Sequence, residues 1–304
     1  MKYVSDIKEL IGNTPLIKLT HIGIKENVNI FAKLECFNPG GSIKDRIGVS
    51  MIEGAEKEGI LKKGYTIIDA TAGNTGLGIA IAAINKGYNI IFAVPTKFSI
   101  EKQKLIKALG ANIINTPDED GMLGAINKAE ELLKEIPNSI SLEQFENEQN
   151  PLAHYETTGP EIYKALDGQI NYFVAGAGSG GTFTGIVRYL KEKDKNIKGV
   201  LADPEGSTMV GGTHKSYKIE GIGNDFVPKT MDISLVDKVI KVNDDEAFEN
   251  VRVLAKKEGV IVGSSSGAIL AAAIKLSNEI DSGNIVVVFP DRGDRYLSTT
   301  LFDD

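Results

Sequence analysis

One lysine in this chain lies where its amine could act as a nucleophile. Lys44 follows segment 38–42, which reads Asn-Pro-Gly-Gly-Ser, and opens a segment with helical character. The first turn of a helix exposes N–H groups and carries positive potential. Because positive potential disfavours an ammonium, the neutral amine that Schiff-base chemistry requires becomes easier to reach. The simpler alternative is a solvated lysine in a first helical turn.

A second loop, residues 71–76, has the composition of a carboxylate site. It follows an apolar, β-branched segment and precedes a helix of small residues over 77–85. A turn from strand to helix presents backbone N–H groups and hydroxyls to an anion, so the carboxylate of an amino acid would fit. The alternative is an N-cap whose glycines only permit tight packing.

A third loop, residues 176–182, reads Gly-Ala-Gly-Ser-Gly-Gly-Thr and lies between a strand-like segment and a helical one. So many glycines let the backbone curl around a phosphate, and Ser179 and Thr182 add hydroxyl donors. A fourth loop, residues 263–267, places three serines between glycines. An amine, two anion cradles and a neutral hydroxyl are what pyridoxal phosphate (PLP) bound to an amino acid needs.

The third loop also supports a different cofactor. Gly176, Gly178 and Gly181 fit the pattern G-x-G-x-x-G, and Asp203 ends the next strand-like segment. This spacing is typical of dinucleotide-binding folds, in which the acidic residue binds a ribose. A nicotinamide-dependent oxidoreductase is therefore an alternative, although it leaves the first two loops unexplained.

The elements that must position these loops alternate along the chain. Short apolar, β-branched runs predict buried strands, and segments with helical periodicity lie between them. Strand, helix and strand in repetition predict an α/β fold with mostly parallel sheets. The expected strands cover 30–34, 66–70, 89–94, 172–175, 199–202 and 285–289, examples of expected helices are 99–109, 124–135 and 246–257, and 207–229 is expected to be a long loop.

Composition narrows the function classes. The 304 residues carry a net charge of −7 with scattered basic residues, so no nucleic-acid partner is expected. The sequence shows no signal peptide and no membrane span, which predicts a cytoplasmic protein without membrane contact. The single cysteine, Cys36, and three separated histidines exclude a disulfide and predict no metal site.

These motifs resemble the cysteine synthase and cystathionine β-synthase family, the fold-type II PLP enzymes. The resemblance runs from Ile-Gly-Asn-Thr-Pro-Leu at 11–16 to Arg-Tyr-Leu-Ser-Thr at 295–299. It implies a homodimer of chains with two interleaved three-layer α/β/α domains. A smaller mobile domain, 38–149 plus 1–12, would carry Lys44 and the substrate-carboxylate loop. A larger domain, 13–37 and 150–304, would bind the cofactor phosphate.

The resemblance also implies residue roles. Lys44 would form the Schiff base and remove the Cα proton, Asn74 would bind the cofactor's 3′ oxygen, and Ser265 would face the pyridine nitrogen. The phosphate would be bound by Gly178, Ser179, Gly180, Gly181 and Thr182. The substrate would be bound by Thr71, Ala72, Gly73, Thr75, Gln144, Gly223 and Phe98.

Several positions depart from the plain O-acetylserine sulfhydrylase pattern. Ala72 stands where those enzymes usually have serine, and Phe98 replaces a usual methionine. Segments 202–207 and 220–228 look closer to cystathionine β-synthases and contain Glu220 and Asp225. These carboxylates are predicted to be catalytic, by general acid or base assistance, or to hold the ammonium of a second amino acid. The alternative is that both are solvated loop carboxylates.

The implied reaction is β-replacement or β-elimination on a three-carbon L-amino acid: cysteine, serine or O-acetylserine. It would proceed through an α-aminoacrylate, to which a thiol adds. The products would be cystathionine or lanthionine, with hydrogen sulfide released when cysteine is the donor. The alternatives are an O-acetylserine sulfhydrylase that uses sulfide, the nicotinamide-dependent oxidoreductase, and a non-catalytic binding member of the fold, against which the retained Lys44 argues.

Overall fold

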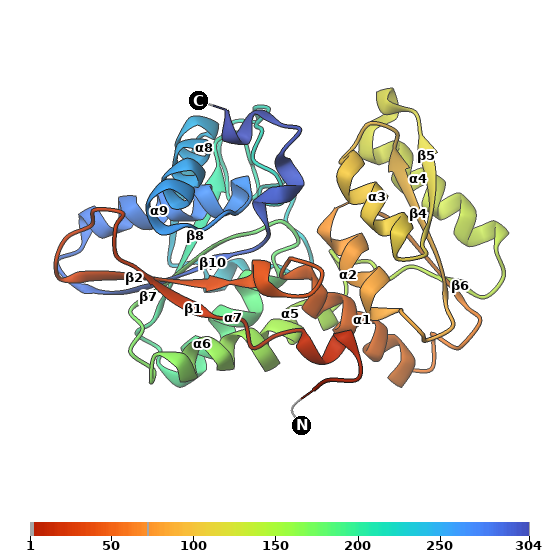
Figure 1. Cartoon of the computed structure of the whole chain (residues 1–304), viewed down its shortest axis with the longest axis horizontal. Coiled ribbons are helices and arrows are strands. Elements are labelled where there is room, and N and C mark those ends of the chain that lie inside the picture. The colour runs from red at the N-terminus through yellow and green to blue at the C-terminus, as the bar shows by residue number, and fades with distance from the viewer. Residues whose placement is uncertain (1–2, 72, 304) are drawn as a thin grey trace. The chain divides into compact units, whose positions relative to one another are not determined.

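Figure 1 shows a computed structural model of the chain, which describes residues 3–71 and 73–303. The chain divides into two compact units, each with its own sheet. Unit 1 consists of Met1–Ile11 and Asn38–Gln149, and unit 2 consists of Gly12–Phe37 and Asn150–Asp304. Nearly all strand pairs are parallel, which confirms the α/β class expected from the alternation of strands and helices.

Unit 1 is built on a four-stranded parallel sheet in the order β5-β4-β3-β6. Its strands are β3 (Thr66–Ala70), β4 (Asn89–Pro95), β5 (Asn112–Thr116) and β6 (Ser139–Ile140). Its helices are α1 (Lys44–Lys57), α2 (Asn74–Ala82), α3 (Ile100–Ala108) and α4 (Gly121–Glu135). Burial of Ala125, Ala129 and Leu132 against Ile68 and Ala93 fixes α4 on the sheet.

Unit 2 contains a six-stranded sheet in the order β1-β2-β10-β7-β8-β9, in which only β1 runs antiparallel to its neighbour. Its strands are β1 (Leu16–Leu19), β2 (Val28–Leu34), β7 (Tyr172–Gly176), β8 (Lys198–Pro204), β9 (Lys238–Val242) and β10 (Gly283–Phe289). Its α-helices are α5 (Gln149–Ala153), α6 (Gly159–Ala165), α7 (Gly181–Lys193), α8 (Asp244–Val253) and α9 (Ser264–Glu279), and His154–Thr158 and Leu254–Glu258 are π-helical turns.

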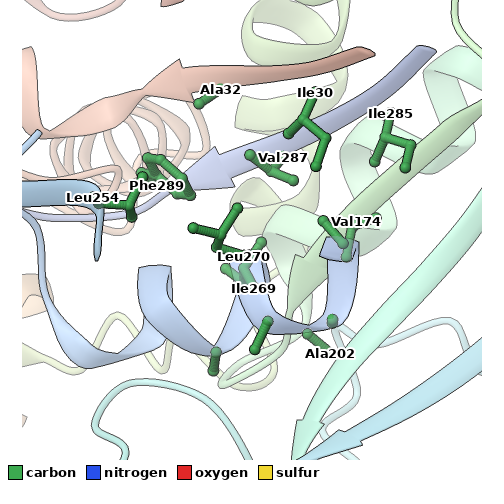
Figure 2. Packing of buried hydrophobic residues seen from close by; sticks show 14 of the residues in the cluster. Ile30, Ala32, Val174, Ala202, Leu254, Ile269, Leu270, Ile285, Val287 and Phe289 are labelled. Carbon is green, nitrogen blue, oxygen red and sulfur yellow. The ribbon is translucent and has the colours of Figure 1, made fainter. Parts of the chain in front are cut away.

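The core of unit 2 explains why its central strands are continuous apolar runs. Figure 2 shows Ile30 of β2, Val287 of β10 and Val174 of β7 packed with Leu270 of α9, and none of the four is accessible to solvent. Strands covered on both faces have no polar side to alternate with. The central strand β10 was therefore visible in the sequence as a run of β-branched residues.

Sequence patterns predicted the strongly apolar elements and missed the weaker ones. All six expected strands are present, as β2, β3, β4, β7, β8 and β10. The strands that were not expected, β1, β5, β6 and β9, are short or mix apolar with polar residues. The expected long loop is confirmed, since 208–229, all of them described, form no helix or strand.

Within 3–71 and 73–303, no helix combines the length and apolar character that crossing a membrane requires. Over the same ranges there is no group of three or more His, Cys, Asp or Glu side chains that could hold a metal ion.

Candidate active site

Lys44 is the first residue of α1, at the end of a loop that its own side chains brace. The buried carboxylate of Asp45 accepts a hydrogen bond from the Gly40 N–H at 2.5 Å, and the Lys44 N–H donates to the Ser42 hydroxyl at 3.2 Å. Nearby, the Asn38 amide donates to the Ser42 carbonyl at 3.1 Å. The glycine-containing segment is thus an ordered turn that places the lysine at a helix N-terminus.

Helix α1 packs directly on α2 through two glycines. A Cβ atom at Gly78 would collide with the carbonyl oxygen of Lys44, and one at Gly48 would collide with the carbonyl of Gly78. The absence of side chains therefore brings the backbones into contact. As a result, Lys44 at the start of α1 lies in the same unit as Asn74, which begins α2.

The residues predicted to bind the substrate carboxylate are in part brought together. The Thr75 hydroxyl donates to Oε1 of Gln144 at 2.7 Å, across 69 positions of sequence. Thr71 is buried, and its Cγ2 would be 3.3 Å from a Cβ at Gly76. Gly73 is the N-cap residue of α2 and has no side chain of its own with which to cap the helix. This helix terminus thus keeps the anion-binding character expected from its sequence.

For two predicted substrate residues, the structure gives no contact with this group among the described residues. Ala72 lies outside the residues that the structure describes. Phe98 precedes α3 and is 41% exposed, and its carbonyl accepts a hydrogen bond from the Gln103 amide at 2.7 Å. A role for either residue stays a prediction.

Asp69, which sequence reasoning missed, braces the Gln144 segment from the end of β3. Its carboxylate accepts hydrogen bonds from the Ser141 hydroxyl at 2.6 Å, the Leu142 N–H at 3.2 Å and the Glu143 N–H at 3.4 Å. Loss of solvent around the carboxylate raises the pKa of Asp69 to about 6, although these hydrogen bonds oppose the shift. One carboxylate thereby links the strand before the 71–76 loop to the segment that carries Gln144.

The raised pKa of Asp69 predicts a pH-dependent stability difference. Between pH 3.8 and about 6 the folded chain binds a proton that the unfolded chain releases, so the contribution of Asp69 to the free energy of unfolding falls as pH rises. The full shift corresponds to at most about 3 kcal/mol. Chemical denaturation of wild type and Asp69→Asn at matched pH is expected to show wild type losing stability relative to the variant across this window. A constant difference from pH 4 to 7 would contradict the assignment.

In unit 2, the glycine loop 176–182 ends at the N-terminus of α7. Gly180 has φ +83° and is the N-cap residue, and no side chain caps the helix. A Cβ at Gly178 would collide with the carbonyl oxygen of Gly221, and one at Gly180 would collide with Met231. These glycines are required by the fold of the loop, and the helix N-terminus is left for an anion.

The segment that carries the predicted acidic residues lies against this glycine loop. The Gly223 N–H donates to the Ala177 carbonyl at 2.8 Å, and the Asn224 amide donates to the Gly178 carbonyl. The Glu220 N–H donates at 3.0 Å to the hydroxyl of Ser264, the first residue of α9. Unit 2 therefore brings the segment of Glu220 and Gly223 together with the glycine loop and with the start of α9, where Ser265 follows Ser264.

Glu220 and Asp225 have different surroundings. Glu220 is partly buried. The pKa of Tyr296 is raised first by the burial of that tyrosine, then by the charge of Asp291 and then by the charge of Glu220. Asp225 is exposed and lies 3.0 Å from Nδ1 of His214, which is itself exposed. Of the two residues, Glu220 is the one whose backbone bonds the first residue of α9.

Asp203, on which the dinucleotide alternative depends, binds a lysine of the protein itself. Its buried carboxylate accepts a hydrogen bond from the Lys241 ammonium at 2.5 Å, and the same ammonium donates to the Ser207 carbonyl at 2.8 Å. The carboxylate thus fixes the beginning of the long loop rather than pointing to a ribose.

The residues of the glycine loop fit the phosphate of PLP. The loop offers an anion the first N–H groups of α7 and the hydroxyls of Ser179 and Thr182. Side chains at Gly178, Gly180 and Gly181 would collide with Gly221, Met231 and Asn150, so the fold of the loop requires glycine there. Behind these hydroxyls lie Asn150 and His154, which sequence reasoning missed as site residues. Their spacing of four within a helical segment, both polar, is the signal that was available.

Known proteins resemble the chain over its whole length. A family model described as pyridoxal-phosphate dependent enzyme matches residues 7–291. A Bacillus subtilis protein named O-acetylserine dependent cystathionine beta-synthase is 51% identical over 304 residues, covering 100% of this chain and 99% of that protein. A Helicobacter pylori protein named cysteine synthase is 45% identical over 305 residues, covering 99% of this chain and 100% of that protein.

Solved structures agree with this assignment. The structure of an O-acetylserine dependent cystathionine beta-synthase from Helicobacter pylori has a TM-score of 0.94 at 45% identity and covers 99% of this chain and 100% of its own. PLP is thereby confirmed as the cofactor, and the nicotinamide alternative is wrong. The chain is a fold-type II, β-replacing PLP enzyme and belongs to the cysteine synthase and cystathionine β-synthase family.

Proposed function

We propose that the enzyme joins a three-carbon amino acid to the thiol of a second amino acid, with O-acetylserine as donor and homocysteine as acceptor. The reaction forms a C–S bond at the donor's β-carbon and releases acetate, and the thiol proton is released to solvent. We base this proposal on Glu220, whose backbone N–H bonds the first residue of α9 and whose segment bonds the glycine loop through Gly223, because a carboxylate near these elements suits an acceptor with its own ammonium. The name of the Bacillus subtilis relative, O-acetylserine dependent cystathionine beta-synthase, supports the choice of donor and product.

The described side chains have distinct tasks in this reaction. When bound, PLP supplies the electron sink that makes the Cα proton of the donor acidic. The Lys44 amine removes that proton, while Thr71, Thr75 and Gln144 hold the donor carboxylate. A neutral hydroxyl from Ser265 faces the ring nitrogen, where it accepts or donates without imposing a charge.

Product analysis tests the proposal directly. O-acetylserine, serine and cysteine are each supplied to the holoenzyme with homocysteine, cysteine or sulfide, and the products are identified by mass spectrometry. We expect cystathionine from O-acetylserine and homocysteine to form with the highest kcat/KM. A higher kcat/KM for sulfide would instead assign the enzyme as a cysteine synthase. Fast sulfide release from cysteine alone would instead favour hydrogen sulfide production as the activity. A similar solved structure is that of a hydrogen sulfide-producing enzyme from Fusobacterium nucleatum, with a TM-score of 0.94 at 41% identity, covering 98% of this chain and 99% of its own.

The role of Glu220 gives a separable prediction. Glu220→Gln is expected to raise the KM for homocysteine about 10-fold, the loss of one charge-assisted contact. The KM for sulfide, which has no ammonium, is expected to stay unchanged. Glu249→Gln, an exposed position on α8, serves as the matched control. Equal changes for homocysteine and sulfide would show that Glu220 does not recognise the acceptor.

A further inference from the structure

Two buried polar side chains lie directly behind the hydroxyls of the glycine loop. Asn150 and His154 come from α5 and the π-helical turn that follows it, and neither is accessible to solvent. The Asn150 amide donates to Oγ of Ser179 at 2.8 Å, and Nε2 of His154 lies 3.1 Å from Oγ1 of Thr182. Each of these two hydroxyls thus has its own buried partner from the segment 149–158.

Close packing holds these two side chains in place. A Cβ at Gly181 would collide with Oδ1 of Asn150, and one at Gly185 would lie 2.9 Å from Cβ of His154. Nδ1 of His154 is a further 3.0 Å from Oγ1 of Thr158, one helical turn later. The imidazole is therefore fixed at both ring nitrogens, by hydroxyls on opposite sides.

Donor and acceptor counting then fixes the direction of the hydrogen bonds. The amide nitrogen of Asn150 only donates, so Ser179 accepts there, and its own hydrogen is left for another acceptor. For His154, the tautomer with hydrogen on Nε2 donates to Thr182 and leaves the Thr182 hydrogen for the cradle. In the opposite tautomer, Nε2 of His154 accepts the Thr182 hydrogen. The Thr182 oxygen then presents its lone pairs to an anion in the cradle, and these repel the anion.

We propose that Asn150 and His154 are positioning residues that aim the hydroxyl hydrogens of Ser179 and Thr182 at the cofactor phosphate, with His154 held as the neutral Nε2–H tautomer. The inference rests on the assignment of the glycine loop as the phosphate site. It adds a chain of hydrogen bonds from Thr158 through His154 and Thr182 to that phosphate.

Binding of two forms of the cofactor separates this role from a general structural one. PLP and pyridoxal, which lacks the phosphate, are titrated into the full-length apoenzyme by equilibrium dialysis. His154→Leu is expected to weaken PLP binding about 10-fold, as for one hydrogen bond to a charged group, and to leave pyridoxal binding unchanged. His154→Gln, whose amide nitrogen can take the place of Nε2, is expected to restore PLP binding. Tyr155→Phe is the matched control, because the Tyr155 hydroxyl bonds exposed Glu192 instead.

A spectroscopic measurement on the wild-type holoenzyme needs no variant to fold. With three histidines in the chain, ¹⁵N NMR of histidine-labelled protein, assigned by comparison with His21→Gln and His214→Gln, reports the His154 tautomer. Hydrogen on Nε2 would support the proposal, and hydrogen on Nδ1 would overturn it. In the binding experiment, equal losses of PLP and pyridoxal affinity in His154→Leu would also overturn it. If Ser179→Ala and Thr182→Val leave PLP affinity unchanged, the phosphate assignment itself is wrong, and this inference fails with it.

Discussion

Replacing Lys44 with alanine is expected to abolish β-replacement, with a loss in kcat of roughly 10⁴-fold, the upper range for a single catalytic base. The variant keeps the braced loop, because the Gly40–Asp45 bond does not involve Lys44 and the bond to Ser42 uses the Lys44 backbone N–H and not its amine. What disappears is the group that would carry the cofactor and remove the Cα proton. Product formation from O-acetylserine and homocysteine measures the effect.

Two companion variants separate the amine from its charge. Lys44→Arg keeps a cation that stays protonated, so it cannot supply a neutral nucleophile, and it is expected to be as inactive as Lys44→Ala. Lys57→Ala removes an exposed lysine at the end of the same helix and is expected to leave kcat unchanged. Substantial turnover by Lys44→Arg would mean that Lys44 contributes only positive charge.

The second large effect is expected from Gly78→Leu, at the contact between α1 and α2. A side chain here must displace the Lys44 carbonyl, which is backbone and cannot rotate away. Overpacking of this kind costs about 1–3 kcal/mol or more of unfolding free energy. Because the displaced atom belongs to Lys44, activity is expected to fall even in the fraction that remains folded. Thermal denaturation and the kcat of purified, folded enzyme measure the two losses.

Ala108→Leu introduces the same side chain at the exposed last position of α3 and is the control for hydrophobicity. It is expected to change stability by less than about 0.5 kcal/mol, as surface substitutions usually do. If the Gly78→Leu enzyme had the kcat and the thermal denaturation midpoint of wild type, α1 and α2 would be able to move apart without loss of stability or activity.

Local chemistry explains which parts of the site the sequence predicted. The loop around residues 71–76 was recognisable because its glycines and hydroxyls follow directly after the apolar strand β3. Asp69 was not, because its three partners lie more than 70 positions away, and only the folded sheet brings them together. The same holds for Asn150 and His154, since the loop they support is 28 or 29 positions further along the chain.

The weaker strands were missed for a related reason. β9 reads Lys-Val-Ile-Lys-Val and β5 reads Asn-Ile-Ile-Asn-Thr, so neither is a continuous apolar run. β5 and β9 lie at the edges of their sheets, where one side of the strand has no neighbour and the side chains are less buried. The apolar pattern identifies a strand only where both of its faces are covered.

The position of β10 between β2 and β7 has a consequence for how the protein is made. A ribosome releases all of unit 1 once Gln149 has emerged, whereas β2, already synthesised, still lacks its parallel neighbour. That neighbour follows roughly 250 residues later, about 10–50 s at ordinary elongation rates. During this interval β2 can pair with β1, but its other edge has no partner in the final sheet. We expect the nascent chain to fold unit 1 first and to depend on chaperones, most of all, between the synthesis of β2 and that of β10.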